Sequence, residues 1–206
     1  MMRALGKTVG RTRRFLRCAL AWRNPERRHA PIAWCLIAGW IWLLASLRGD
    51  SGWTEITLAA LYLSAVLAAV CAIDARYGII PDSLVVALAL GGLSQALLAD
   101  QPDRLPRVIV EAALFFLAAS LFRAGYRRVR GYYGLGFGDV KFATAGVLWI
   151  GIQAVPQLLI MAVLSAFASL LILRAEGHSL NGKQAISFGP HLAIGLWLSW
   201  IAQVLL

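Results

Sequence analysis

Three acidic residues of this chain stand at the ends of apolar segments, where a charged side chain is costly. Asp74 ends a segment that reads Ala-Ala-Val-Cys-Ala-Ile, Asp82 comes shortly before another, and Asp139 follows the run Gly-Leu-Gly-Phe-Gly. Inserting a carboxylate at the centre of a membrane helix costs about 2.5–3.5 kcal/mol. Each of these acids therefore needs a partner or a function. The other acids lie in polar connections or near segment ends, and Glu111 is expected either at the membrane interface or facing a helix partner.

Asp74 and Asp139 have the chemistry of an aspartyl dyad if their helices bring them together. Two close carboxylates do not both ionise easily, so one of them keeps a proton. The ionised carboxylate can then take a proton from a water that attacks a peptide carbonyl, while the protonated one donates to the carbonyl oxygen. This reaction uses two carboxyl groups and one water, with no metal, serine or cysteine. The pair therefore predicts peptide hydrolysis.

The elements that must position this pair are membrane-spanning helices. Sixty per cent of the 206 residues are hydrophobic, 15% are charged, and the mean hydropathy is +0.70. Such a composition is too apolar for a soluble domain, and the apolar residues form blocks long enough to cross a bilayer. The predicted fold is an all-α polytopic membrane helix bundle with about seven transmembrane helices, at roughly 31–47, 54–73, 82–99, 107–124, 136–152, 156–173 and 187–205. The fifth segment is short, so six crossings and one re-entrant segment is the alternative.

Basic residues orient the bundle. Nine of the twenty lysines and arginines precede residue 30, at Arg3, Lys7, Arg11, Arg13, Arg14, Arg17, Arg23, Arg27 and Arg28. Because basic residues favour the cytoplasmic side, the amino terminus is expected in the cytoplasm. Asp74 then ends an inward-running span and Asp139 begins an outward-running one, which places both at the cytoplasmic face. Residues 1–30 are predicted to form a basic tail, either disordered or a helix on the membrane surface, and residues 31–206 a single membrane domain.

The glycines at 134, 136 and 138 have two interpretations. They can adopt unusual backbone dihedral angles and let an extended substrate strand approach the backbone. Alternatively, they form a flexible connection into the fifth helix or allow close helix packing.

Several other functions have to be weighed against hydrolysis. The net charge of +10 suggests nucleic acid, but the basic residues cluster in the tail without aromatic residues for base stacking, so no nucleic-acid partner is expected. Without a Cys-x-x-Cys pair, no metal site is expected. Intramembrane acids also occur in ion-coupled transporters, which usually show internal repeats. A non-enzymatic pilus or secretion assembly factor and a lipid-headgroup transferase are further alternatives.

Three segments of the sequence resemble the type IV prepilin peptidases, intramembrane aspartyl proteases of the GxGD type. Asp74 followed by Ile-Pro-Asp at 80–82 resembles their first catalytic motif. Gly-Phe-Gly-Asp-Val-Lys at 136–141 resembles the second, and Phe-Gly-Pro at 188–190 resembles a third recurring segment. The motifs occur in the order of the family, and the resemblance covers roughly residues 31–205.

The resemblance implies an aspartyl endopeptidase that cleaves leader peptides at the cytoplasmic face of the bacterial inner membrane, without a cofactor. Its implied substrates are prepilins, or the pseudopilins of type II secretion, which carry a basic leader before a hydrophobic helix. By motif position Asp74 and Asp139 are the catalytic pair. Supporting or substrate-binding roles are implied for Pro81, Gly136, Gly138, Lys141, Phe188, Gly189 and Pro190. Asp82 is expected to cap the third span, Lys141 to tune the dyad or meet a lipid phosphate, and His191 to be packed or hydrogen-bonded.

The chain departs from many members of this family in its amino-terminal region. Those members carry a cytoplasmic domain whose paired cysteines bind zinc and which methylates the new amino terminus. Residues 1–30 contain Cys18 as their single cysteine. A short form of the family that cleaves prepilins without N-methylation is therefore expected.

Overall fold

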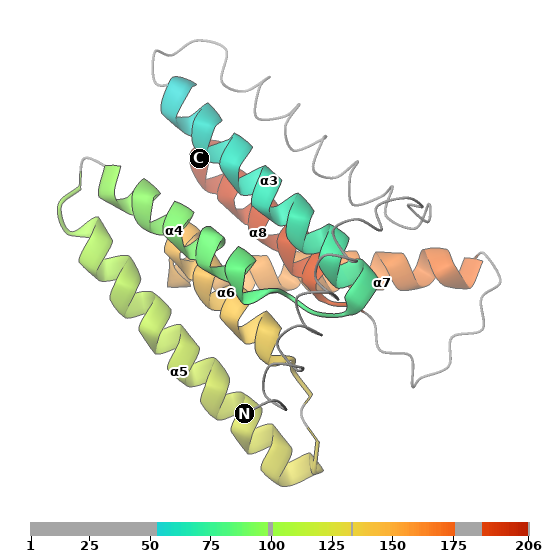
Figure 1. The fold of residues 1–206 in the computed structure, drawn as a ribbon. Helices are drawn as coiled ribbons and strands as arrows, with labels where there is room; N and C mark the ends of the chain where they lie inside the picture. Colours follow the sequence, from blue (N-terminus) through green and yellow to red (C-terminus); the bar gives the residue numbers. More distant parts are fainter. Residues whose placement is uncertain (1–52, 99–100, 133, 176–186, 206) are drawn as a thin grey trace, which may run out of the picture. The chain divides into compact units, whose positions relative to one another are not determined.

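The computed structural model describes residues 53–98, 101–132, 134–175 and 187–205, and these residues form helices with short connections (Figure 1). The basic tail at 1–30 and the first expected span at 31–47 lie outside the described residues. In chain order the helices are α3 (Trp53–Tyr77), α4 (Asp82–Leu98), α5 (Arg104–Arg130), α6 (Phe137–Ile150), the 3₁₀ turn η2 (Ile152–Ala154), α7 (Val155–Ala175) and α8 (Gly189–Leu205).

Every expected span after residue 53 coincides with one of these helices, with ends that differ by a few residues. Three of them contain stretches long and apolar enough to cross a membrane, at Ile56–Tyr77, Arg104–Arg130 and Ile152–Leu171, and α4 is a shorter apolar helix. The 14 residues of α6 extend over about 21 Å, less than a hydrocarbon core of about 30 Å. The all-helical class is confirmed for the described residues, whereas the count of about seven crossings stays a prediction.

Helix ends are marked by glycines with positive φ angles. Gly78, Gly131 and Gly151 have φ angles of 63°, 78° and 72°, which L-residues with a side chain rarely adopt. Their backbone N–H groups donate to the carbonyls of Asp74, Arg127 and Val147 at 2.7–2.8 Å. Because Gly78 stops α3 one turn after Asp74, that acid lies in the last turn of its helix.

The most buried helix of the described residues is α8, which packs against α3, α6 and α7. Trp197 and Trp200 are almost fully buried in it. Gly195 allows the close approach of α7, because a Cβ atom there would collide with the carbonyl oxygen of Leu158. Small residues of this kind bring membrane helices into van der Waals contact, which drives helix association where water does not.

Large apolar side chains are exposed along α5 and α7, for example Leu114, Leu117 and Leu121 on α5 and Ile160 and Val163 on α7. Exposed apolar faces of this length suit contact with lipid chains rather than water. Together with the three long apolar helices, they identify a multi-pass membrane protein.

Two connections hold α6 in place beside α4 and α8. The indole N–H of Trp149 donates to the carbonyl of Leu88 on α4 at 2.8 Å, and the side-chain amide of Gln203 on α8 donates to the carbonyl of Ile150 at 2.6 Å. These bonds lie at the end of α6 remote from Asp139, and they join that end to α4 and α8.

Candidate active site

Asp74 is a buried carboxylate at the end of α3, with 5% of its surface exposed. Its Oδ2 atom accepts two hydrogen bonds, one from the backbone N–H of Gly189 at 2.9 Å and one from the hydroxyl of Ser187. Donors directed at a carboxylate favour its ionised form. The start of α8 therefore forms a small anion-binding cradle for Asp74.

Gly189 is needed in this cradle because of the space it leaves. A Cβ atom at position 189 would lie 2.5 Å from Oδ2 of Asp74, closer than such atoms approach in real structures. Gly189 is also the first residue of α8, where backbone N–H groups lack partners within the helix and the helix dipole favours a negative charge. Glycine at position 189 therefore lets the backbone N–H reach Asp74, whereas a side chain there would collide with the carboxylate.

Asp139 lies in the first turn of α6, behind Gly136 at the N-cap position. It is partly buried and lies within electrostatic range of Asp74. The helices α3 and α6 reach this common end mainly through their packing on α8 and α4. The structure therefore brings together the two acids that the sequence singled out.

The glycines before Asp139 act differently from one of our expectations. None of Gly134, Gly136 and Gly138 has a positive φ angle, so the prediction of unusual dihedral angles is wrong for them. The approach of a substrate strand to these glycines stays a prediction; at Gly136 itself, a Cβ atom would lie 2.8 Å from a carboxylate oxygen of Asp139. At Gly138 the nearest neighbour of a Cβ atom would be Ile80 at 3.5 Å, an ordinary contact.

Asp82 and Lys141 form an ion pair that links α4 to α6 next to the two acids. Lys141 Nζ donates to Asp82 Oδ1 at 2.7 Å, and the same ammonium lies 4.9 Å from the centre of the Phe137 ring. Asp82 is the first residue of α4, and the carbonyl of Pro81 accepts the first helical hydrogen bond, from Val85. The expectation that Asp82 caps this helix is therefore wrong, since its carboxylate binds Lys141 instead.

The remaining motif residues surround the start of α8. Phe188 directly precedes α8, and its carbonyl accepts hydrogen bonds from the N–H groups of His191 and Leu192. Pro190 is buried in the first turn, where the missing N–H of proline is not needed. The buried ring of His191 bonds the Ser165 hydroxyl through Nδ1 at 2.9 Å, as expected of a packed, hydrogen-bonded histidine. The segment Phe188–Pro190 thus places the backbone N–H of Gly189 against the carboxylate of Asp74.

Sequence reasoning missed Ser187. The only signal was a hydroxyl next to the Phe-Gly-Pro segment, and 113 positions separate it from the carboxylate that it contacts. Glu111, in contrast, does face a partner helix: its Oε2 accepts the N–H of Ile152 at 2.9 Å and its Oε1 accepts Arg107 Nε at 3.0 Å. It serves the connection between α6 and α7 and takes no part in the acid pair.

The chain is similar to a known protein family and to curated relatives. Residues 61–173 match the model of the type IV leader peptidase family. Among curated relatives, the prepilin leader peptidase/N-methyltransferase of Dickeya chrysanthemi is 33% identical over 91% of this chain and 62% of its own length. The proteins of the same name from Aeromonas hydrophila and Neisseria gonorrhoeae are 36% and 31% identical, over 72% and 74% of this chain and about half of their own lengths.

The chain spans roughly half to three fifths of the length of these relatives. No solved structure matches it. The family match covers both acids and the helices that carry them, from α3 to α7. This chain therefore belongs to the type IV leader peptidase family.

Proposed function

We propose that this chain is an intramembrane aspartyl endopeptidase that removes the leader peptide of type IV prepilins or pseudopilins at the cytoplasmic face of the bacterial inner membrane. The observation that carries the proposal is the pairing of Asp74 and Asp139, which come from different helices and interact electrostatically at one end of the bundle. The family and the names of the relatives supply the class of substrate.

The contacts of the two acids suggest different roles for them. Asp74 accepts two hydrogen bonds on Oδ2, from Ser187 and Gly189, which stabilise a negative charge on it. We assign Asp74 as the ionised member that activates water. Asp139 is then the member that holds the shared proton, because two close carboxylates do not both ionise easily.

The reaction follows from these roles. Asp74 takes a proton from a water as the water oxygen bonds to the peptide carbonyl carbon, while Asp139 gives its proton to the carbonyl oxygen. The product is a neutral tetrahedral diol. As its C–N bond breaks, Asp74 passes its proton to the leaving nitrogen and Asp139 recovers one from a diol hydroxyl, which restores the starting dyad.

Substrate entry fits a membrane-embedded helix that carries a basic leader. Asp74 and Asp139 lie at helix ends, where the segment between leader and hydrophobic helix would meet the bilayer surface. Figure 1 shows α5 and α7 reaching outward from the other helices, and their apolar faces are exposed. A pilin helix could lie in the lipid beside either of them while its cleavage site reaches the acids.

Co-expression with a prepilin from the same genome tests the proposal, with the mass of the pilin as the measurement. Loss of the leader with the wild-type chain, and its retention with Asp74→Asn and with Asp139→Asn, is the expected result. Leader retention with the wild-type chain across every prepilin and pseudopilin of that genome would contradict it and leave an assembly role. Cleavage that survives either Asn variant would exclude the dyad.

Leader removal without N-methylation is a separate part of the proposal. The three cysteines of the 206 residues, Cys18, Cys35 and Cys71, include no Cys-x-x-Cys pair of the kind that holds structural zinc. We therefore expect these 206 residues to cleave a prepilin while the new amino terminus gains no methyl group from S-adenosylmethionine. A pilin heavier by one methyl group in that assay would refute this part and leave the peptidase untouched.

A further inference from the structure

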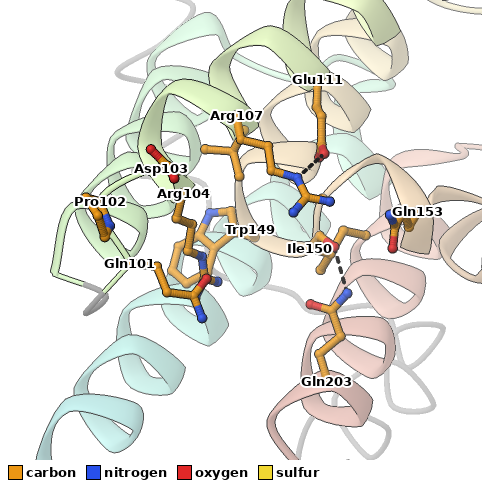
Figure 2. A pocket seen from close by; sticks show the side chains of 12 residues that line it. Gln101, Pro102, Asp103, Arg104, Arg107, Glu111, Trp149, Ile150, Gln153 and Gln203 are labelled. Carbon is orange, nitrogen blue, oxygen red and sulfur yellow. Dashed lines mark hydrogen bonds and ion pairs between the residues drawn. The ribbon is translucent and has the colours of Figure 1, made fainter.

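A polar cavity of about 530 Å³ lies at the end of the helices opposite Asp74 and Asp139 (Figure 2). In α6, Ile150 of the cavity wall is eleven residues beyond Asp139, and in α8, Gln203 is fourteen residues beyond Gly189. At 1.5 Å per residue these intervals are about 16 and 21 Å. The cavity therefore lies near the membrane surface that is remote from the acids, and belongs to a different site.

Two guanidinium groups line this cavity with much of their hydrogen-bonding capacity unused. Arg107 donates through Nε to Glu111 at 3.0 Å, and in Figure 2 the rest of its guanidinium extends toward Ile150 and Gln153. Arg104 has no ion pair within the described part of the chain. Guanidinium groups with free N–H donors are suited to binding phosphate.

The carboxylate of Asp103 also lines the cavity, and it does not cap its helix. Asp103 occupies the N-cap position of α5, where aspartate normally accepts a hydrogen bond from the first turn, but its side chain makes no such bond. Among the described residues that line the cavity, Asp103 and Glu111 balance the formal charges of Arg104 and Arg107. A zwitterion, with one phosphate and one ammonium, matches this pattern better than a plain anion does.

Apolar surface leads from the cavity along α5. Ile109, Val110 and Leu114 follow within about three turns and expose 47%, 57% and 56% of their surfaces. In a bilayer this face contacts acyl chains, and a phospholipid lying against it has its headgroup at the level of Arg104 and Arg107.

We propose that the cavity binds the headgroup of a phosphatidylethanolamine. Its phosphate accepts hydrogen bonds from Arg104 and from the free nitrogens of Arg107, and its ammonium donates to Asp103. The lipid would hold the start of α5 against the ends of α6 and α8, at a distance from the peptidase chemistry.

Native mass spectrometry of the purified protein in detergent tests this, with phosphatidylethanolamine, phosphatidylcholine and phosphatidylglycerol added in turn. Arg104→Gln should weaken phosphatidylethanolamine binding roughly tenfold, because a hydrogen bond to a charged group is lost. Asp103→Asn should remove the preference over phosphatidylcholine, whose ammonium has no N–H. The matched control is Arg130→Gln, at the exposed far end of α5, which should bind the lipid as the wild type does.

Two results would overturn the proposal. One is equal phosphatidylethanolamine binding by wild type, Arg104→Gln and Asp103→Asn. The other is displacement of the lipid by equimolar glycerophosphoethanolamine or inorganic phosphate, which would make the ligand a soluble phosphate compound and not a membrane lipid.

Discussion

The backbone N–H of Gly189 donates to Oδ2 of Asp74 across 2.9 Å, although 115 positions separate the two residues in the chain. This bond joins the last turn of α3 to the first residue of α8. It exists only because position 189 has no side chain, since a Cβ atom would lie 2.5 Å from the same oxygen. The third motif of the sequence thus supports the first.

Gly189→Ala should therefore cost activity by displacing Asp74. Misplacing a reacting group by about 1 Å can lower a rate about 100-fold, so a loss of at least tenfold in leader cleavage is expected. Gly125→Ala on α5 is the matched control, because nothing lies within 4 Å of a Cβ atom there. Equal rates of prepilin cleavage by both variants would show that the position of Asp74 does not depend on this contact.

The two acids should be individually essential. Asp74→Asn and Asp139→Asn keep side-chain volume but remove the base or the acid, which should lower cleavage at least about 100-fold while the purified protein keeps its helical circular dichroism. Asp82→Asn is the control: its carboxylate is 75% exposed, and an exposed pair contributes at most about 1 kcal/mol, so cleavage should persist. A comparable loss in Asp82→Asn would mean that the ion pair with Lys141 belongs to the catalytic machinery.

Ser187 is predicted to be a positioning residue for Asp74. Ser187→Ala removes one of the two donors to Oδ2, so kcat should fall roughly tenfold while KM for the prepilin changes little. Ser187→Thr keeps the hydroxyl and should restore most of the rate. If the two variants behave alike, or if the loss appears in KM, the hydroxyl does not act through Asp74.

Apolar segment lengths predicted most of the described fold. The helices α3 to α8 coincide with the expected spans because a membrane imposes long apolar stretches, whereas the glycines that end α3, α5 and α6 were not part of that prediction. The beginning of α4 at residue 82 was predicted, but the partner of Asp82 was not predictable from residue type. An aspartate at the start of a helix suits an N-cap, yet Asp82 forms an ion pair with a lysine that comes 59 positions later.

The acid pair was predictable, whereas its surroundings were not. Asp74 and Asp139 stand out because a carboxylate in a membrane span is costly, and the order of the spans places both at one end. The hydrogen bonds from Ser187 and Gly189 depend on how α8 packs against α3, which the pattern of apolar residues does not specify. The shared end of the two helices was therefore recoverable from the order of the spans, and the hydrogen bonds that α8 makes to Asp74 were not.

The pH dependence of cleavage should be bell-shaped. Below the optimum the dyad holds two protons and no base remains; above it the dyad holds none and no proton donor remains. His191 also lies within electrostatic reach of Asp74, so His191→Asn is the control and should keep both limbs of the profile. Rates of leader release from a purified prepilin, measured from about pH 4 to about pH 10, provide the test. A flat profile over that range would exclude a shared proton, and loss of one limb in His191→Asn would assign that limb to the histidine.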